Sequence, residues 1–195
     1  MSGYVYLGVI GIAYFCLQHA VIHFLIRAVY PKYNEMNSHD FHDYRMQINA
    51  MFHGSMATFF ALYCLFWTCP GDKTFFNDEE CRLVPRNSHM LLCFFTAGYL
   101  LVETAFILGY VGVENTIDKQ TLIHHILGFA NFYVAFWQQD FVVTTGAAQI
   151  FLEVSTPFVC LRWLFFHHGI KGGSLAQSIN SVILFICFIF GRALF

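Results

Sequence analysis

The chain has 195 residues, of which 57% are hydrophobic, 11% are charged and 24 are phenylalanine. So small a charged fraction cannot cover the surface of a water-soluble domain of this size, and the composition therefore indicates a membrane protein. The net charge is -2, and Lys and Arg form no cluster in the sequence. Because proteins bind nucleic acids mainly through basic side chains, nucleic acid is not an expected partner.

Six segments are apolar enough to cross a bilayer, which takes about twenty residues. In chain order they are residues 4–26, 48–68, 89–110, 121–137, 142–166 and 175–195. The first segment lacks a positively charged start and a small-residue cleavage site, so we interpret it as a retained helix rather than a signal peptide. The connecting loops are too short for a soluble domain. We therefore predict one domain over residues 1–195, an all-α polytopic membrane protein with six transmembrane helices around a central polar-lined cavity.

Six crossings would place both ends of the chain on the same side of the membrane. The three loops on the other side carry more basic residues: Arg27, Lys32, Arg45, Lys119, Arg162 and Lys171, against Lys73, Arg82, Arg86 and Arg192. The positive-inside rule therefore favours that other side as cytoplasmic. Cys69 and Cys81 share one non-cytoplasmic loop, where an oxidising compartment would let them form a disulfide. Two unpaired thiols are the alternative.

Polar residues recur inside the apolar segments at spacings of three, four or seven, which place them on one face of each helix. They include Asn49, His53, Thr96, Glu103, His124, Asn131, Gln149, Glu153, Thr156, Gln177 and Asn180. Turning these faces toward a common interior would satisfy them with one another, water or a ligand. Direct hydrogen bonds between helices, worth about 0.6 kcal/mol each, are the alternative, which we prefer for the amides and hydroxyls.

Glu103 and Glu153 differ from the other polar residues, because a carboxylate inside a membrane helix is costly unless it is paired or protonated. Their expected partners are His53, His124, His125 and Arg162. Pro157 removes a hydrogen bond to the carbonyl of Glu153 and so predicts a kinked, polar position. A Glu–His pair can act as a general acid and base, or it can simply satisfy a buried carboxylate. The sequence is compatible with both the catalytic and the structural role.

Three strings carry a resemblance to a known family: TAGYLLVETAFILGY over residues 96–110, IHHILGFANFY over residues 123–133 and LEVSTPFVCLRWLF over residues 152–165. With them the chain resembles, over roughly residues 15–195, the TLC-domain membrane proteins. These include ceramide synthases, translocon-associated membrane proteins and small lipid-related members, and the small non-synthase members are the most similar. The resemblance implies a lipid-accessible cavity in the endoplasmic reticulum membrane, with His124 and His125 near its cytoplasmic mouth.

The pattern departs from the ceramide synthases, whose histidine pair works with two aspartates to transfer an acyl group from acyl-CoA to a sphingoid amine. The corresponding aspartate positions hold Leu152 and Ser155, and the nearest acid, Glu153, is one residue out of register. We therefore expect binding or handling of membrane lipid, related to acyl chains or sphingolipids, without full synthase activity. If the protein is an enzyme, an acyl-CoA-dependent acyltransferase is expected.

Candidate site residues follow from the helix faces and the resemblance together. Those with a catalytic role would be His124, His125 and Glu153, and those that bind substrate would be Glu103, Asn131, Gln149 and Arg162. No cofactor and no metal are expected for this site. Membrane lipids are the expected partners.

Two other functions remain open at this stage. A small apolar membrane domain can serve as a non-catalytic accessory subunit of a larger membrane complex, including one in the mitochondrial inner membrane. The sequence also contains histidines spaced as in some di-iron lipid desaturases and hydroxylases: His19 and His23, His39 and His42, His124 and His125, and His167 and His168. Imidazole suits iron, but the H-x-x-H-H string typical of those enzymes does not occur.

Overall fold

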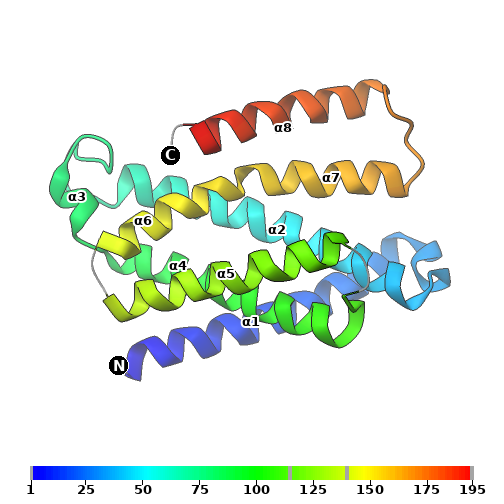
Figure 1. The fold of residues 1–195 in the computed structure, drawn as a ribbon, viewed down its shortest axis with the longest axis horizontal. Helices are drawn as coiled ribbons and strands as arrows, with labels where there is room; N and C mark the ends of the chain where they lie inside the picture. The colour runs from blue at the N-terminus through cyan, green and yellow to red at the C-terminus, as the bar shows by residue number, and fades with distance from the viewer. Residues whose placement is uncertain (1, 114–115, 139–140, 194–195) are drawn as a thin grey trace.

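The computed structural model describes residues 2–113, 116–138 and 141–193 and shows a bundle of long, roughly antiparallel helices (Figure 1). The elements are α1 (Ser2–Val29), η1 (Pro31–Glu35), α2 (Ser38–Trp67), α3 (Glu79–Leu83), α4 (Asn87–Phe106), η2 (Ile107–Val111), α5 (Thr116–Gln138), α6 (Phe141–Ile150), η3 (Phe151–Ser155), α7 (Thr156–His167) and α8 (Leu175–Ala193). No β-strand occurs in these ranges. The predicted all-α fold class is confirmed.

Among the described residues, four helical stretches are long and apolar enough to cross a membrane: Val9–Val29, Ser38–Trp67, Glu79–Tyr110 and Thr144–His167. Leu175–Gly191 is a shorter apolar helix. The chain is therefore a polytopic membrane protein, as predicted. α5 and α8 lie over the two remaining predicted segments, for which crossing the membrane stays a prediction.

The start of α2 differs from the predicted one, because the helix begins at Ser38 rather than at residue 48. The side chain of Asn37 caps it by accepting a hydrogen bond from the backbone N–H of Asp40 at 2.9 Å. His39 and His42, which lie outside the predicted apolar segments, therefore belong to the first turns of the helix. Hydropathy marks only the part of a helix that hydrocarbon covers, so a polar extension of this kind is missed.

The predicted break near Pro157 is confirmed, since α6 and α7 are joined by the 3₁₀ segment η3. The carbonyl of Glu153, which proline deprives of its usual helical donor, accepts a bond from the backbone N–H of Thr156. α2 packs closely against this break at Gly54. A Cβ at Gly54 would lie 2.9 Å from Cβ of Thr156, so any larger residue would push the helices apart.

The interior of the bundle contains α2 and α4, around which the other helices pack (Figure 1). Its core combines aromatic and small residues, including Phe15, Ala57, Ala61, Leu92 and Cys93. α1 crosses α4 at a pair of glycines, and a Cβ at Gly98 would lie 3.2 Å from the backbone of Gly11. α1 and α4 therefore approach almost backbone to backbone, which brings the polar side chains of α1 into the interior.

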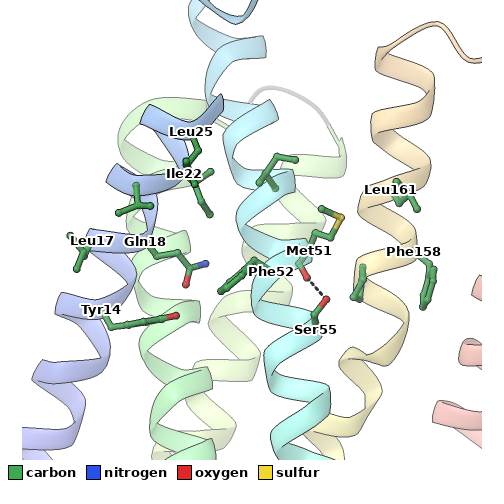
Figure 2. A pocket seen from close by; sticks show the side chains of 13 residues that line it. Tyr14, Leu17, Gln18, Ile22, Leu25, Met51, Phe52, Ser55, Phe158 and Leu161 are labelled. Carbon is green, nitrogen blue, oxygen red and sulfur yellow. Dashed lines mark hydrogen bonds between the residues drawn. The ribbon is translucent and has the colours of Figure 1, made fainter. Parts of the chain in front are cut away.

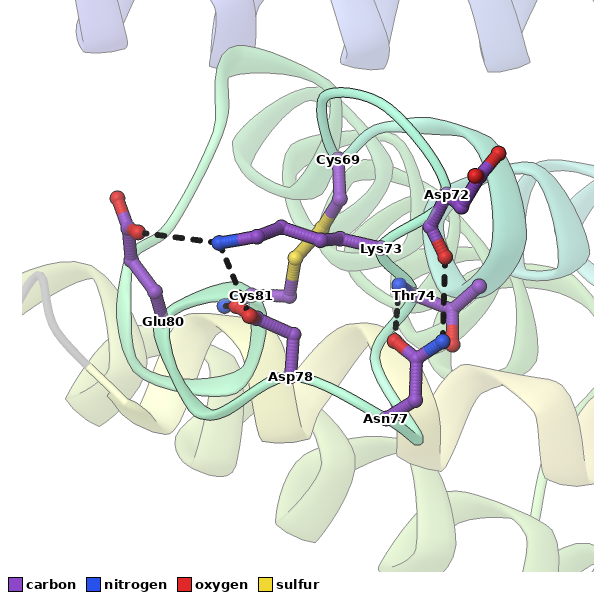
Figure 3. Close-up of polar contacts among 8 residues, drawn as sticks. All are labelled: Cys69, Asp72, Lys73, Thr74, Asn77, Asp78, Glu80 and Cys81. Atoms are coloured by element: carbon purple, nitrogen blue, oxygen red, sulfur yellow. Dashed lines mark hydrogen bonds and ion pairs between the residues drawn. A yellow bond between two sulfur atoms is a disulfide. The ribbon is translucent and has the colours of Figure 1, made fainter.

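Cys69 and Cys81 form a disulfide in the loop between α2 and α4, with their Cα atoms 6.0 Å apart, so this prediction is confirmed (Figure 3). Nζ of Lys73 lies 3.0 Å from a carboxylate oxygen of Asp78 and 3.7 Å from one of Glu80. The hydrogen bond from Lys73 lowers the pKa of Asp78. The loop lies at the same end of the bundle as the first turn of α1 and the last turn of α8, as the predicted topology requires (Figure 1).

Candidate functional site

A polar cavity of about 370 Å³, which we call the central cavity, lies between α5 and η3, with α2 and α4 behind it. Its hydrogen-bonding lining residues are His53, Thr96, Tyr99, His124, Asn131, Gln149, Glu153, Ser155 and Thr156. The described residues that line it include no Lys and no Arg. Of the predicted site residues, His124, Asn131, Gln149 and Glu153 are therefore brought together around one space.

Glu153 reaches the central cavity because η3 replaces an α-helical turn directly before Pro157. Its Oε2 accepts a hydrogen bond from Oγ1 of Thr156 at 2.5 Å. Among the described residues, no ion pair joins Glu153 to a histidine or to Arg162, so the structure gives no support to the predicted partners of this carboxylate. The hydroxyl of Thr156, three residues away, thus satisfies one carboxylate oxygen of Glu153 within the same segment.

Asn131 and Gln149 form a direct link between α5 and α6. Nδ2 of Asn131 donates to Oε1 of Gln149 at 3.1 Å. This contact agrees with the interpretation that we preferred for the amides, a hydrogen bond between helices. Both side chains also line the central cavity, so the pair can still exchange this bond for one to a ligand.

The adjacent His124 and His125 point to different surroundings, because successive helix residues differ by about 100° in direction. His124 lines the central cavity, and its ring centroid is 5.8 Å from that of His125. His125 is only 6% exposed, packs edge-on against Tyr99 and has no partner for Nδ1 among the described residues. The two predicted catalytic histidines are thus not equivalent, and His124 is the one with direct access to the cavity.

His53 on α2 is a lining residue that the sequence indicated only as a partner for a carboxylate. It is 1% exposed, and its ring stacks on that of Tyr99 with centroids 3.7 Å apart. Neither ring nitrogen has a hydrogen-bond partner among the described residues, and the same holds for Oγ1 of Thr96. Buried polar atoms are seldom left unpaired, but these atoms have less than 1 Å² of exposed surface, so the side chains would have to turn to reach a ligand in the cavity.

Glu103, predicted to bind substrate, does not line the central cavity but belongs to a buried polar cluster formed by Gln18, His19, Asn49 and Glu103. Its Oε1 lies 2.9 Å from Nδ2 of Asn49 and 3.1 Å from Nε2 of His19. Its predicted partners, on α2, α5 and α7, were wrong. The spacing of residues in α4 identifies the face of that helix but not the neighbour that covers it, which here is α1.

Arg162 also lies away from the central cavity, contrary to the prediction. It is exposed on α7, with its guanidinium 5.7 Å from the ring of Phe166. Arg162 follows Glu153 by nine residues, which is about two and a half helical turns. The two side chains are consequently directed to opposite sides of the helix.

The histidines considered for a di-iron centre contact several different partners. His19 bonds to Glu103, whereas Nε2 of His168 lies 2.9 Å from the hydroxyl of Tyr44. Within the described part of the chain, no group of three or more His, Cys, Asp or Glu residues is arranged to hold a metal ion. The arrangement of these residues gives no support to the di-iron hypothesis.

Comparison with known proteins identifies the family of the chain. A model of the TLC domain matches residues 43–195, so the chain belongs to the TLC-domain family. A relative, TLC domain-containing protein 4-B of Xenopus laevis, is 32% identical over 98 residues, which are 50% of this chain and 36% of that protein. No solved structure matches. The family match begins after α1, although we expected the resemblance to start near residue 15.

Proposed function

We propose that the protein binds a membrane lipid and holds its polar end in the central cavity. The observation that carries this proposal is a cavity with hydrogen-bonding groups from α2, α4, α5, α6, η3 and α7 inside a membrane-embedded bundle. Polar groups at such a position are costly unless they serve a ligand or a transport path. Since a carboxylate lines the described walls and no Lys or Arg does, the cavity suits a hydroxyl, amide or amine better than a phosphate.

Within this proposal, His124 and Glu153 would contact the polar end of the lipid, and Asn131 and Gln149 would close the space around it. We also propose that the protein lacks full ceramide synthase activity. The synthase carboxylates are absent at Leu152 and Ser155, and His125, which packs edge-on against Tyr99, is not among the residues that line the cavity. We also propose the endoplasmic reticulum membrane as the location, on the basis of the family.

The test is lipid retention by protein purified in mild detergent and analysed by native mass spectrometry. We expect His124→Ala and Glu153→Gln each to reduce the bound lipid at least about fivefold, the effect of one lost hydrogen bond of about 1 kcal/mol. Val182→Ala, at an exposed position on α8, is the control and should bind lipid like the wild type. Equal lipid in all four proteins would contradict the proposal.

Two further measurements distinguish the other functions. Purified protein incubated with a long-chain acyl-CoA and a sphingoid amine should form no amide, and product formation that is lost in His124→Ala would instead establish an acyltransferase. Proteins that co-purify in fixed ratio, and are lost together with bound lipid in Glu153→Gln, would identify an accessory subunit. Fractionation of cells between endoplasmic reticulum and mitochondria tests the proposed location.

A further inference from the structure

A second recess, which we call the α1–α7 groove, lies between α1 and α7 with α2 as its floor (Figure 2). It has a volume of about 610 Å³ and shares no lining residue with the central cavity. Most of its lining is apolar: Leu17, Val21, Ile22, Leu25, Ile48, Met51, Phe52, Pro157, Phe158 and Leu161. Since α1 precedes the segment matched by the family model, the groove depends on a helix outside that match.

The groove contains one buried polar side chain with an unpaired atom. Gln18 is 8% exposed, and its Oε1 has no hydrogen-bond partner among the described residues. Figure 2 shows the side chain extending from α1 toward α2 at the level of Tyr14 and Ser55. The hydroxyl of Ser55 is already used, because it donates to the carbonyl of Met51 at 2.8 Å.

The buried polar cluster determines which atom Gln18 presents to the groove. The carboxylate of Glu103 can only accept, so the amide of Asn49 must direct its Nδ2 donor toward Glu103, at 2.9 Å. Oδ1 of Asn49 is then an acceptor and receives a bond from Nε2 of Gln18 at 2.7 Å. The amide N–H₂ of Gln18 therefore donates to Asn49, and its Oε1 is an acceptor without a partner among the described residues. This oxygen has less than 1 Å² of exposed surface, so an occupant must lie directly against the Gln18 amide and bring a hydrogen-bond donor to satisfy it.

Tyr14 adds the complementary group, since its hydroxyl lies one helical turn before Gln18 and lines the same groove. A hydroxyl group both donates and accepts, so it can donate to Oε1 of Gln18 and accept from the Tyr14 O–H. An ether or an ester oxygen could only accept and would leave Gln18 unpaired. The Gln18 acceptor and the Tyr14 donor together therefore suit the hydroxyl group of an alcohol.

The depth of Gln18 limits the charge of the occupant. Gln18 follows Val9 by nine residues and precedes Val29 by eleven in the span Val9–Val29. At 1.5 Å per residue these are roughly 14 and 16 Å, so Gln18 lies near the middle of the span. A charged head group at that depth is too costly, whereas an uncharged hydroxyl is not.

The size of the groove favours a single lipid over a transmembrane helix. Pockets that hold one small molecule measure about 300–1,000 Å³, and the groove falls in that range. A helix about 30 Å long and 10 Å wide occupies roughly 2,400 Å³ and could only lie across it.

We propose that the α1–α7 groove binds one uncharged lipid with a free hydroxyl group. The hydroxyl donates to Gln18 and accepts from Tyr14, and the hydrocarbon body lies along Val21, Leu25 and Leu161. This site is independent of the central cavity and of the proposed function, because no lining residue is shared.

The test uses protein in lipid nanodiscs and three probes of equal chain length that carry the same photoactivatable diazirine: hexadecanol, its methyl ether and ionised palmitate. We expect the alcohol to label peptides from α1 and α7 about fivefold more than either other probe, since only the alcohol supplies an uncharged donor. Gln18→Leu should abolish this preference. Equal labelling by alcohol and ether in the wild type would overturn the proposal, and so would cross-linking of two chains through the groove.

Two variants keep the test interpretable if Gln18→Leu disturbs folding. Leu161→Trp fills the groove without changing a hydrogen bond and should reduce labelling by the alcohol severalfold. Val182→Trp places the same ring on an exposed position of α8 and should leave labelling unchanged. Equal labelling of the two tryptophan variants would overturn the proposal, because the alcohol would then not be bound in the groove. The lipid retained in the central cavity should be unaffected by Leu161→Trp, which separates this result from failure of the proposed function.

Discussion

Replacing His19 by leucine would leave the carboxylate of Glu103 without its histidine partner. Glu103 is 1% exposed, and its Oε1 lies 3.1 Å from Nε2 of His19. Removing one partner of a buried pair costs about 3–5 kcal/mol, and here Glu103 would keep only the hydrogen bond from Asn49. We expect His19→Leu to lower the free energy of unfolding by that amount.

The double variant His19→Leu/Glu103→Leu should be less destabilised than His19→Leu, although it contains one more substitution. It removes both members of the pair and leaves mainly Nδ2 of Asn49 without an acceptor, a cost of about 1–3 kcal/mol. The measurement is the free energy of unfolding by SDS titration in mixed micelles for the wild type, both single variants and the double variant.

The control for this cycle is His125→Leu combined with Glu103→Leu, because His125 is also a buried histidine but contacts Tyr99 rather than Glu103. Those two substitutions should be additive within about 0.5 kcal/mol. A coupling energy between His19 and Glu103 no larger than that of the control would refute the assignment of His19 as the partner.

Removing the disulfide by Cys69→Ser/Cys81→Ser should lower stability by about 3 kcal/mol in the chain-entropy model, and wild type treated with reductant should unfold at the same temperature as the variant. A wild-type melting temperature that reductant does not change would contradict this. Gly54→Val should cost about 1–3 kcal/mol, because its Cβ would overlap Thr156, whereas Gly109→Val has open space around the new Cβ and serves as the matched control in thermal melts.

The sequence predicted the helices well and their polar extensions poorly. Apolar length is the physical requirement for crossing a bilayer, so the membrane class and the all-α fold follow from composition and periodicity. The first turns of α2 contain His39, Asp40 and Asp43, whose polarity made them look like a loop. They form a helix because Asn37 caps it, and capping is a local signal independent of hydropathy.

The site was predicted in part for a comparable reason. Helical spacing correctly placed Glu153 and His124 on the inner faces of their helices, and both line the central cavity. Spacing cannot tell which neighbouring helix covers a face, and the partner of Glu103 was therefore missed. Arg162 could have been excluded from periodicity, since it lies about half a turn away from the face of Glu153.

The buried polar cluster also connects α1 to the rest of the bundle. His19 lies outside the segment that matches the TLC domain, whereas Asn49 and Glu103 lie inside it. α1 therefore supplies one hydrogen-bonding partner of Glu103, and the matched segment supplies the other. A chain in which α1 is displaced would leave this carboxylate with Asn49 as its remaining partner, which is costly inside a membrane. The docking of α1 and the completion of the polar interior of the bundle are therefore coupled.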